Sequence, residues 1–355
     1  MPAPGYGSKS DGEGWDWQMD LNIRARKRGL TTEGFLSLLV VALLVALYFF
    51  AGGTNGFYSI QNIMNVGRVF SYLFIAGIGM TMIIITGNID ISFGAVISVI
   101  AIVMAAVSKI DKNIPVYVFL PVGMVVGALL CGFNAWMMAK FKIPSIVITL
   151  ATTQIYYGAL LWLLEGSIYN LRTNWTWFTF KANLFGGYVP VSIVIGLILL
   201  IVSVLFFKYS RFVKRLYAIG NNKRGALYAG INVDWTLIIA YMIAGALLGF
   251  SAAILATQGT RVTCTVGNNL EMKIIAAVIV GGTSAVGGAG NVYGTALGAL
   301  LLAIISPALT QLGVNTYWTD LFTGVIIVSA IVVSGVRGMG LHVFRKKTGL
   351  VRMEG

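Results

Sequence analysis

The sequence predicts an all-α polytopic transmembrane helical bundle of about ten membrane-spanning helices, with both termini in the cytoplasm. Three observations lead to this prediction: an apolar composition, long uncharged stretches and an uneven distribution of Lys and Arg. Hydrophobic residues make up 57% of the 355 residues, charged residues make up 10%, and the mean hydropathy is +0.85. Soluble domains contain about 25% charged residues, so the composition excludes an ordinary water-soluble fold.

Ten apolar stretches are the predicted crossings, because a helix needs about 20 apolar residues to pass a bilayer. They are 35–51, 69–86, 91–108, 115–139, 145–164, 191–207, 236–258, 272–286, 292–312 and 319–334. The eighth and ninth come from one uncharged run of 46 residues, Ile274 to Thr319. That run is too long for one crossing, and we expect it to fold back at the glycine cluster of 281–290.

The distribution of Lys and Arg sets the predicted orientation. With ten crossings and both termini inside, 18 of the 25 Lys and Arg residues lie on the cytoplasmic side, as the positive-inside rule requires. The net charge of +13 then reflects topology and attraction to anionic membrane lipid, so no nucleic acid is expected as a partner. We divide the chain into a polar cytoplasmic tail (1–33), a transmembrane domain (34–336) and a basic cytoplasmic tail (337–355).

The residues needed for catalysis or metal binding are scarce. The chain has one histidine and two cysteines, Cys131 and Cys264, which lie far apart in the sequence. No GxxxxGK[ST] phosphate loop occurs. We therefore expect no catalytic residues, no metal site and no cofactor in this chain, and any ATP and Mg²⁺ would be bound by partner subunits.

Asp90 is the most notable polar exception, in the stretch GNIDISFG between the second and third crossings. One hypothesis makes Asp90 a ligand for an ion or solute; the other, which we favour, makes it the N-cap of the next helix. Asn88 and Ser92 can serve either purpose.

Further polar residues line the fifth crossing, where Thr149, Thr152 and Thr153 lie within two turns. This face could border a solute path, and interhelical hydrogen bonding explains it equally well. We predict a path along these threonines, the turn at Asn88, Asp90 and Ser92, and the glycine-rich reentry that begins with Gly281, Gly282 and Thr283.

The loop 209–234 is longer than a simple turn requires. Its middle section, 221–230, is predicted to form a short amphipathic helix. The loop is interpreted as a docking element for a cytoplasmic partner, and a basic segment on the membrane surface is the alternative.

Four segments resemble the permease subunits of bacterial ATP-binding-cassette (ABC) importers of the ribose, galactose and xylose type, which are related to branched-chain amino acid permeases. They are TGNIDISFGAVIS (86–98), GFNAWMMAKFKIPSIVITLAT (132–152), LYAIGNNKRGALYAGINV (216–233) and AAVIVGGTSAVGGAGNVYGTALGALLL (276–302). The resemblance implies the ABC importer permease fold, a multi-pass location in the bacterial inner membrane and no enzymatic activity in this chain. The segment 216–233 would then contact the ATPase, through Leu216, Ala218, Gly220, Asn221, Arg224, Ala226 and Gly230.

The partners implied by the resemblance are two ABC ATPase subunits, a periplasmic solute-binding protein and a second permease subunit, identical or not. The solute would be a monosaccharide or a related small polar molecule, moved by alternating access. The main alternative is an ion-coupled secondary transporter that uses Asp90, with Glu271 as a further candidate ligand for the proton or cation. A membrane scaffold that transports nothing is a third possibility.

Overall fold

The computed structural model describes residues 58–110, 116–166, 189–258 and 261–311, strand residues 169–170 and 183–184, and scattered positions within 34–45 and 313–328. Its helices are α3 (Ile60–Ile85), α4 (Phe93–Ile110), α5 (Val116–Phe141), α6 (Ser145–Leu164), α7 (Val191–Tyr209), α8 (Arg211–Asn221), α9 (Lys223–Tyr228), α10 (Val233–Gln258), α11 (Leu270–Val280) and α12 (Val292–Gln311). Two short antiparallel ribbons pair β1 (Tyr169–Asn170) with β4 (Arg261–Val262), and β2 (Asn183–Leu184) with β3 (Val189–Pro190).

The described part of the chain contains 6 helices that are long and apolar enough to cross a membrane: α3, α5, α6, α7, α10 and α12. This confirms the predicted polytopic helical architecture. Helix α4 contributes a shorter apolar stretch, Phe93–Ser108. The first and tenth predicted crossings, 35–51 and 319–334, lie largely outside the described residues.

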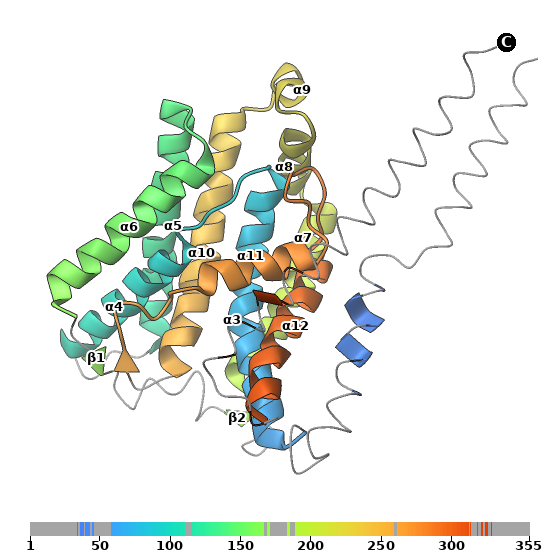
Figure 1. The fold of residues 1–355 in the computed structure, drawn as a ribbon. Helices are drawn as coiled ribbons and strands as arrows, with labels where there is room; N and C mark the ends of the chain where they lie inside the picture. Colours follow the sequence, from blue (N-terminus) through green and yellow to red (C-terminus); the bar gives the residue numbers. More distant parts are fainter. Residues whose placement is uncertain are drawn as a thin grey trace, which may run out of the picture.

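Helix α3 forms the centre of the bundle (Figure 1). Every residue from Phe70 to Ile85 is buried except Tyr72, which is half-buried, and α3 packs against α7, α10, α11 and α12. A helix that is apolar on all sides is stable only where neighbours or lipid cover every side. The apolar sequence of α3 therefore accounts for its central position.

Helices α5 and α10 make the most extensive helix pair, and glycines explain their close approach. Gly123 and Gly127 on α5 face Gly245 and Gly249 on α10. A Cβ on Gly127, Gly245 or Gly249 would collide with the facing helix, and one on Gly123 would lie 3.3 Å from the Gly249 carbonyl. Each helix thus presents two glycines four residues apart, the spacing that lets transmembrane backbones pack closely.

Helix α11 is shorter than the eighth predicted crossing, 272–286. Its 11 residues extend about 17 Å, whereas the hydrocarbon core is about 30 Å thick. Figure 1 shows that α11 runs across the bundle instead of along α3 and α10. The helix stops because Gly281 ends it and Gly282 has a φ of 92°, which continues no right-handed helix. This stretch is therefore not a full crossing.

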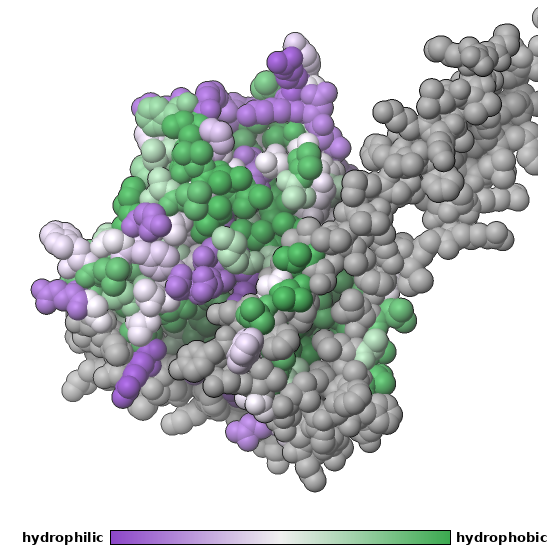
Figure 2. All heavy atoms as spheres, in the orientation of Figure 1, coloured by the Kyte–Doolittle hydropathy of each residue, from purple (hydrophilic) through white to green (hydrophobic). Residues whose placement is uncertain are grey.

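The bundle has two distinct ends (Figure 1). We call them the α8 end, where α8 contacts the last residue of α3 and α9 follows α8, and the strand end, where the ribbons lie. In Figure 2 hydrophilic residues gather over the α8 end, above a band of hydrophobic surface. The amphipathic helix of the 209–234 loop is α8 at 211–221, earlier than predicted, with Val213, Leu216 and Ile219 buried. The predicted range, 221–230, contains only the six residues of α9.

Candidate functional site

The turn between α3 and α4 holds Asp90 in a fully buried position. Its Oδ1 accepts hydrogen bonds from the Ser92 backbone N–H (2.8 Å) and the Ser92 hydroxyl (2.6 Å). Helix α4 begins at Phe93, and the carbonyl of Ser92 accepts its first helical hydrogen bond, from Val96. Ser92 therefore precedes the helix, and Asp90 closes the turn two residues earlier instead of acting as the N-cap.

The other oxygen of Asp90 is free for another contact. Oδ2 is buried and has no hydrogen-bond partner among the described residues, and the buried hydroxyl of Tyr241 on α10 likewise has none there. Asn134 on α5 supports the turn, because its Nδ2 donates to the Ser92 hydroxyl (2.9 Å). An unpaired buried carboxylate oxygen is costly. Such an oxygen is able to accept a hydrogen bond from a solute or to coordinate a cation.

Helix α8 is attached to the glycine-rich loop 281–291. The Tyr217 hydroxyl donates to the Gly290 carbonyl (2.6 Å), and Asn221 Nδ2 donates to the Gly288 carbonyl (3.1 Å). The Gly288 N–H in turn donates to the carbonyl of Ile85, the last residue of α3 (2.8 Å). Burial raises the pKa of Tyr217, so its hydroxyl stays protonated as a donor.

Glycines allow these three elements to touch. Gly220 on α8 has no room for a Cβ, which would collide with the Ile85 carbonyl. Gly87 and Gly287 also lie against each other, with φ values of 79° and 95°. We call this contact of α8, the 86–92 turn and the 281–291 loop the α8 junction; its members are Ile85, Gly87, Tyr217, Gly220, Asn221, Gly287, Gly288 and Gly290.

The predicted threonine face lies on α6. Thr149 and Thr152 are buried and Thr153 is half-buried, and all three hydroxyls donate to carbonyls of their own helix. The start of α6 contacts the Asp90 turn, because the Ile89 N–H donates to the Ser145 hydroxyl (3.3 Å). Helix α6 therefore begins beside the Asp90 turn, and the three threonines follow along this helix.

The first residues of the glycine loop lie against α12. A Cβ on Gly281 would collide with Gly294, and Gly282 is exposed. Thr283 is buried, and its hydroxyl has no hydrogen-bond partner among the described residues. The loop thus adds another unpaired buried oxygen atom, beside the end of α3, to those of Asp90 and Tyr241.

Asn88 lies in the 86–92 turn, and its Nδ2 donates to the Thr86 hydroxyl (3.0 Å). It lines a cavity of about 220 Å³ together with Ser145, Lys142 and Asp234. Lys142 and Asp234 form an exposed ion pair (2.7 Å) between the end of α5 and the start of α10. The start of α6 and the glycine loop therefore each contact the 86–92 turn, at Ile89 and at Gly87.

The seven predicted ATPase-contact residues divide into two groups. Leu216 and Ala226 are buried, and Ala218 and Gly220 are half-buried, so these four position α8 and α9. Asn221, Arg224 and Gly230 are exposed. Helix α9 also exposes two large apolar side chains, Leu227 and Tyr228, which are 53% and 91% exposed.

Sequence reasoning missed several residues of these sites. It omitted Tyr217, although its spacing of four from Asn221 places both on one helical face. Asn134 was not expected to support Asp90, because its contact partner Ser92 lies 42 residues away. Glu271, the second candidate ion ligand of the secondary-transporter alternative, is buried beside Gly94, and its Oε2 has no hydrogen-bond partner among the described residues.

Comparisons with known proteins give a consistent family. Residues 62–331 match the family described as the branched-chain amino acid transport system / permease component. The chain is 30% identical over 313 residues to the ribose import permease protein RbsC of Haemophilus influenzae, covering 86% of this chain and 93% of that protein. It is 32% identical over 300 residues to RbsC of Bacillus subtilis, covering 84% and 90%.

Another relative has a different named solute. The autoinducer 2 import system permease protein LsrC of Salmonella paratyphi B is 30% identical over 298 residues, covering 82% of this chain and 84% of that protein. No solved structure gives a significant match. The family match spans most of the helical bundle, including the Asp90 turn and the α8 junction, and the chain belongs to the family of the branched-chain amino acid transport system permease component.

Proposed function

We propose that this chain is the membrane-spanning permease subunit of an ABC importer that moves a monosaccharide or a related small polar solute. The observation that carries the proposal is the α8 junction: an amphipathic helix at one end of the bundle is hydrogen-bonded to a loop beside a buried polar turn. The import functions in the names of the relatives agree with it. ATP hydrolysis takes place on separate ATPase subunits.

Helix α9 is the proposed contact with the ATPase. Its exposed side chains Leu227 and Tyr228 offer an apolar anchor with a basic surround that includes Lys223 and Arg224. An exposed aromatic residue beside an arginine is typical of the residues that dominate protein interfaces. In the proposed orientation the α8 end is cytoplasmic and the strand end faces a periplasmic solute-binding protein.

The α8 junction would transmit ATPase movement to the transport path. A displacement of α8 pulls on Gly288 and Gly290, and the loop that contains them joins α11 to α12. The same loop is hydrogen-bonded to the end of α3 at Ile85. Packed elements with two discrete arrangements can convert such a shift into alternating access.

The proposed path uses the turn of Asn88, Asp90 and Ser92, the α6 threonines Thr149, Thr152 and Thr153, and the loop residues Gly281, Gly282 and Thr283. The unpaired Asp90 Oδ2 and Thr283 hydroxyl are the atoms best suited to hydrogen-bond a passing hydroxylated solute. The path would be completed by a second permease subunit, as in a two-fold assembly.

A second function is favoured by the buried, unpaired Asp90 Oδ2: a secondary transporter in which Asp90 binds a proton or cation. The two proposals differ in energy source. Uptake by an ABC importer stops when ATP is depleted, whereas uptake by the carrier stops when the ion gradient is collapsed and needs no ATPase.

The decisive experiment is co-purification from membranes in mild detergent, comparing the wild-type chain with Leu227→Asp/Tyr228→Asp. We expect an ABC ATPase to co-purify with the wild type and to be lost from the double variant. Tyr209→Asp is the matched control, because Tyr209 is also exposed at this end but lies outside α9. Recovery of ATPase with the double variant contradicts the docking role of α9; absence of any ATPase from the crosslinked wild type favours the carrier.

A further inference from the structure

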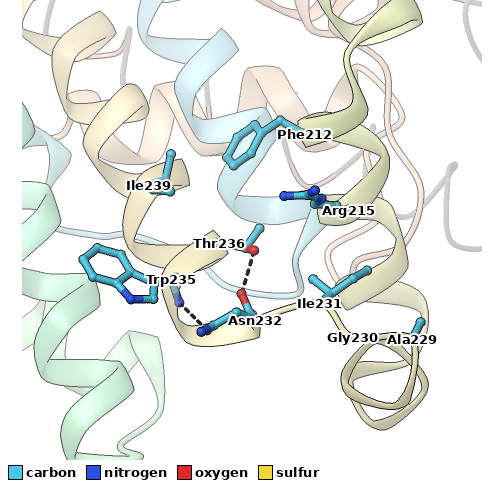
Figure 3. Close-up of a pocket in the computed structure, with 9 residues that line it drawn as sticks. All are labelled: Phe212, Arg215, Ala229, Gly230, Ile231, Asn232, Trp235, Thr236 and Ile239. Atoms are coloured by element: carbon cyan, nitrogen blue, oxygen red, sulfur yellow. Dashed lines mark hydrogen bonds between the residues drawn. The ribbon is translucent and has the colours of Figure 1, made fainter.

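A groove between α8 and the start of α10 has a chemistry that the transport proposal does not use. It has a volume of about 360 Å³ and is lined by Phe212, Arg215, Ala229, Gly230, Ile231, Asn232, Trp235, Thr236 and Ile239. Figure 3 shows Arg215 extending from α8 toward α10. The groove combines one cation with aromatic and aliphatic walls.

The charge of the groove is positive. Arg215 is exposed, and its guanidinium has no carboxylate partner among the described residues. The nearest acidic residue in sequence, Asp234, is paired with Lys142 (2.7 Å) and does not line the groove. Arg211 and Lys214 add positive charge on the same short helix. A guanidinium without a carboxylate partner is well suited to bind a phosphate group.

Polar groups near Arg215 are paired within the first turn of α10. The Thr236 hydroxyl donates to the Asn232 backbone carbonyl (2.7 Å), and the Asn232 side-chain oxygen accepts from the Trp235 backbone N–H (3.1 Å). These bonds hold the first turn of α10 in place. They leave the guanidinium as the main charged group that faces the groove.

The groove lies where the apolar helices reach the edge of the apolar band. Helix α7 ends at Tyr209 and α10 begins at Val233, and both are long enough to cross a membrane. From the groove, where Trp235 and Ile239 are 61% and 41% exposed, the exposed apolar surface of α10 continues to Met242, which is 39% exposed. Tryptophan is enriched at the level of the lipid headgroups, so the groove opens at that level onto a lipid-facing surface.

We propose that this groove binds an anionic phospholipid of the leaflet at the α8 end. The headgroup phosphate contacts Arg215, and the acyl chains run along Trp235, Ile239 and Met242. The groove does not include Leu227 and Tyr228, the α9 side chains of the proposed ATPase contact, and it shares only Gly230 with the seven predicted ATPase-contact residues. A lipid in this place would fasten the start of α8 to the start of α10.

Native mass spectrometry of the full-length chain tests the proposal, with phosphatidylglycerol and phosphatidylcholine as the two probes. We expect the wild type to retain phosphatidylglycerol in preference to phosphatidylcholine, and Arg215→Gln to weaken that retention by about fivefold, the effect of one basic residue at a charged membrane surface. Lys214→Gln is the matched control, because it removes the same charge from the neighbouring exposed position outside the groove.

Three outcomes would overturn the proposal. Equal loss from Arg215→Gln and Lys214→Gln would mean that general positive charge holds the lipid. Equal retention of the two lipids would mean that no anionic headgroup is recognised. Displacement of the lipid by excess inorganic phosphate would assign Arg215 to a free phosphate instead. Arg215→Lys should retain an intermediate amount, because it keeps the charge and loses the planar guanidinium.

Discussion

At the scale of single residues, the cost of burying Asp90 is reduced by two neighbours. The carboxylate accepts two hydrogen bonds from Ser92, and Asn134 on α5 donates a hydrogen bond to the Ser92 hydroxyl. A buried carboxylate without such bonds would be strongly destabilising. The same arrangement leaves Oδ2 without a partner among the described residues, so one side chain combines a structural role with a proposed solute contact.

Replacing Ser92 by Ala should therefore destabilise the protein. The variant loses the 2.6 Å bond to Asp90 and the acceptor for Asn134, and we expect the free energy of unfolding to fall by about 1 to 3 kcal/mol. Thermal unfolding of the chain in detergent measures the change. Ser192→Ala is the control: Ser192 is also fully buried, but its hydroxyl has no partner among the described residues. Equal effects of the two changes would contradict the role of Ser92.

At the scale of elements, close packing and coupling both depend on glycine. The α5 and α10 backbones meet at Gly127 and Gly245, where neither helix has room for a Cβ. In lipid, van der Waals contact between close backbones replaces much of the hydrophobic driving force. The α8 junction uses glycines in a different way, since Gly87 and Gly287 adopt backbone conformations that other residues rarely reach.

The glycine pair predicts a steric effect on stability. Gly245→Ala should separate α5 from α10 and lower the free energy of unfolding by about 1 to 3 kcal/mol, the usual cost of overpacking. Gly158→Ala on α6 is the control, because a Cβ there meets nothing within 4 Å. Chemical denaturation in detergent compares them. A loss of stability in the Gly158 variant as large as that in the Gly245 variant would rule out steric contact as the cause.

The α8 junction predicts an uncoupled variant. Tyr217→Phe removes the 2.6 Å hydrogen bond to Gly290 but leaves α9 unchanged. We expect the variant to retain the ATPase and to lose most solute uptake, because α8 would move without pulling the loop. Uptake and ATP hydrolysis are measured together in proteoliposomes that contain the whole complex.

Tyr209→Phe is the control for this coupling experiment, since Tyr209 is exposed and lies outside the junction. Normal uptake by the Tyr217 variant would show that the hydroxyl bond carries no coupling. Loss of ATPase binding by the same variant would show instead that Tyr217 positions α9.

At the scale of the whole molecule, polarity distinguishes the two ends of the bundle. Charged residues of α8 and α9 gather at one end, and the two ribbons lie at the other (Figures 1 and 2). Under the positive-inside rule this predicts that the α8 end is cytoplasmic. The α8 end also holds the proposed ATPase contact, so charge and function give the same orientation.

Labelling of single cysteines tests this orientation. In a chain with Cys131 and Cys264 replaced by Ala, Tyr228→Cys should react with a membrane-impermeant maleimide only after the membrane is opened. Arg261→Cys, which is exposed at the strand end, should react in intact spheroplasts. The reverse pattern would place α8 and α9 outside the cell and would be incompatible with an ATPase contact.

The sequence by itself determined the fold class, most helix positions and the family resemblance. The predicted stretch 145–164 matches α6, and the other long described helices differ from their predicted stretches mainly at the ends, because uncharged runs of this length are stable in a membrane only as helices. The same reasoning failed for 272–286, since hydropathy records apolar content and not the direction in which a helix runs.

The tertiary structure alone decided which polar atoms meet. The bonds from Tyr217 to Gly290 and from Asn134 to Ser92 join residues 73 and 42 positions apart, and no local pattern reports such contacts. The favoured N-cap role of Asp90 was wrong for a related reason, because a carboxylate can close a turn or cap a helix with the same local sequence. Hydrophobicity places residues in the membrane, whereas packing of specific side chains selects the pairs.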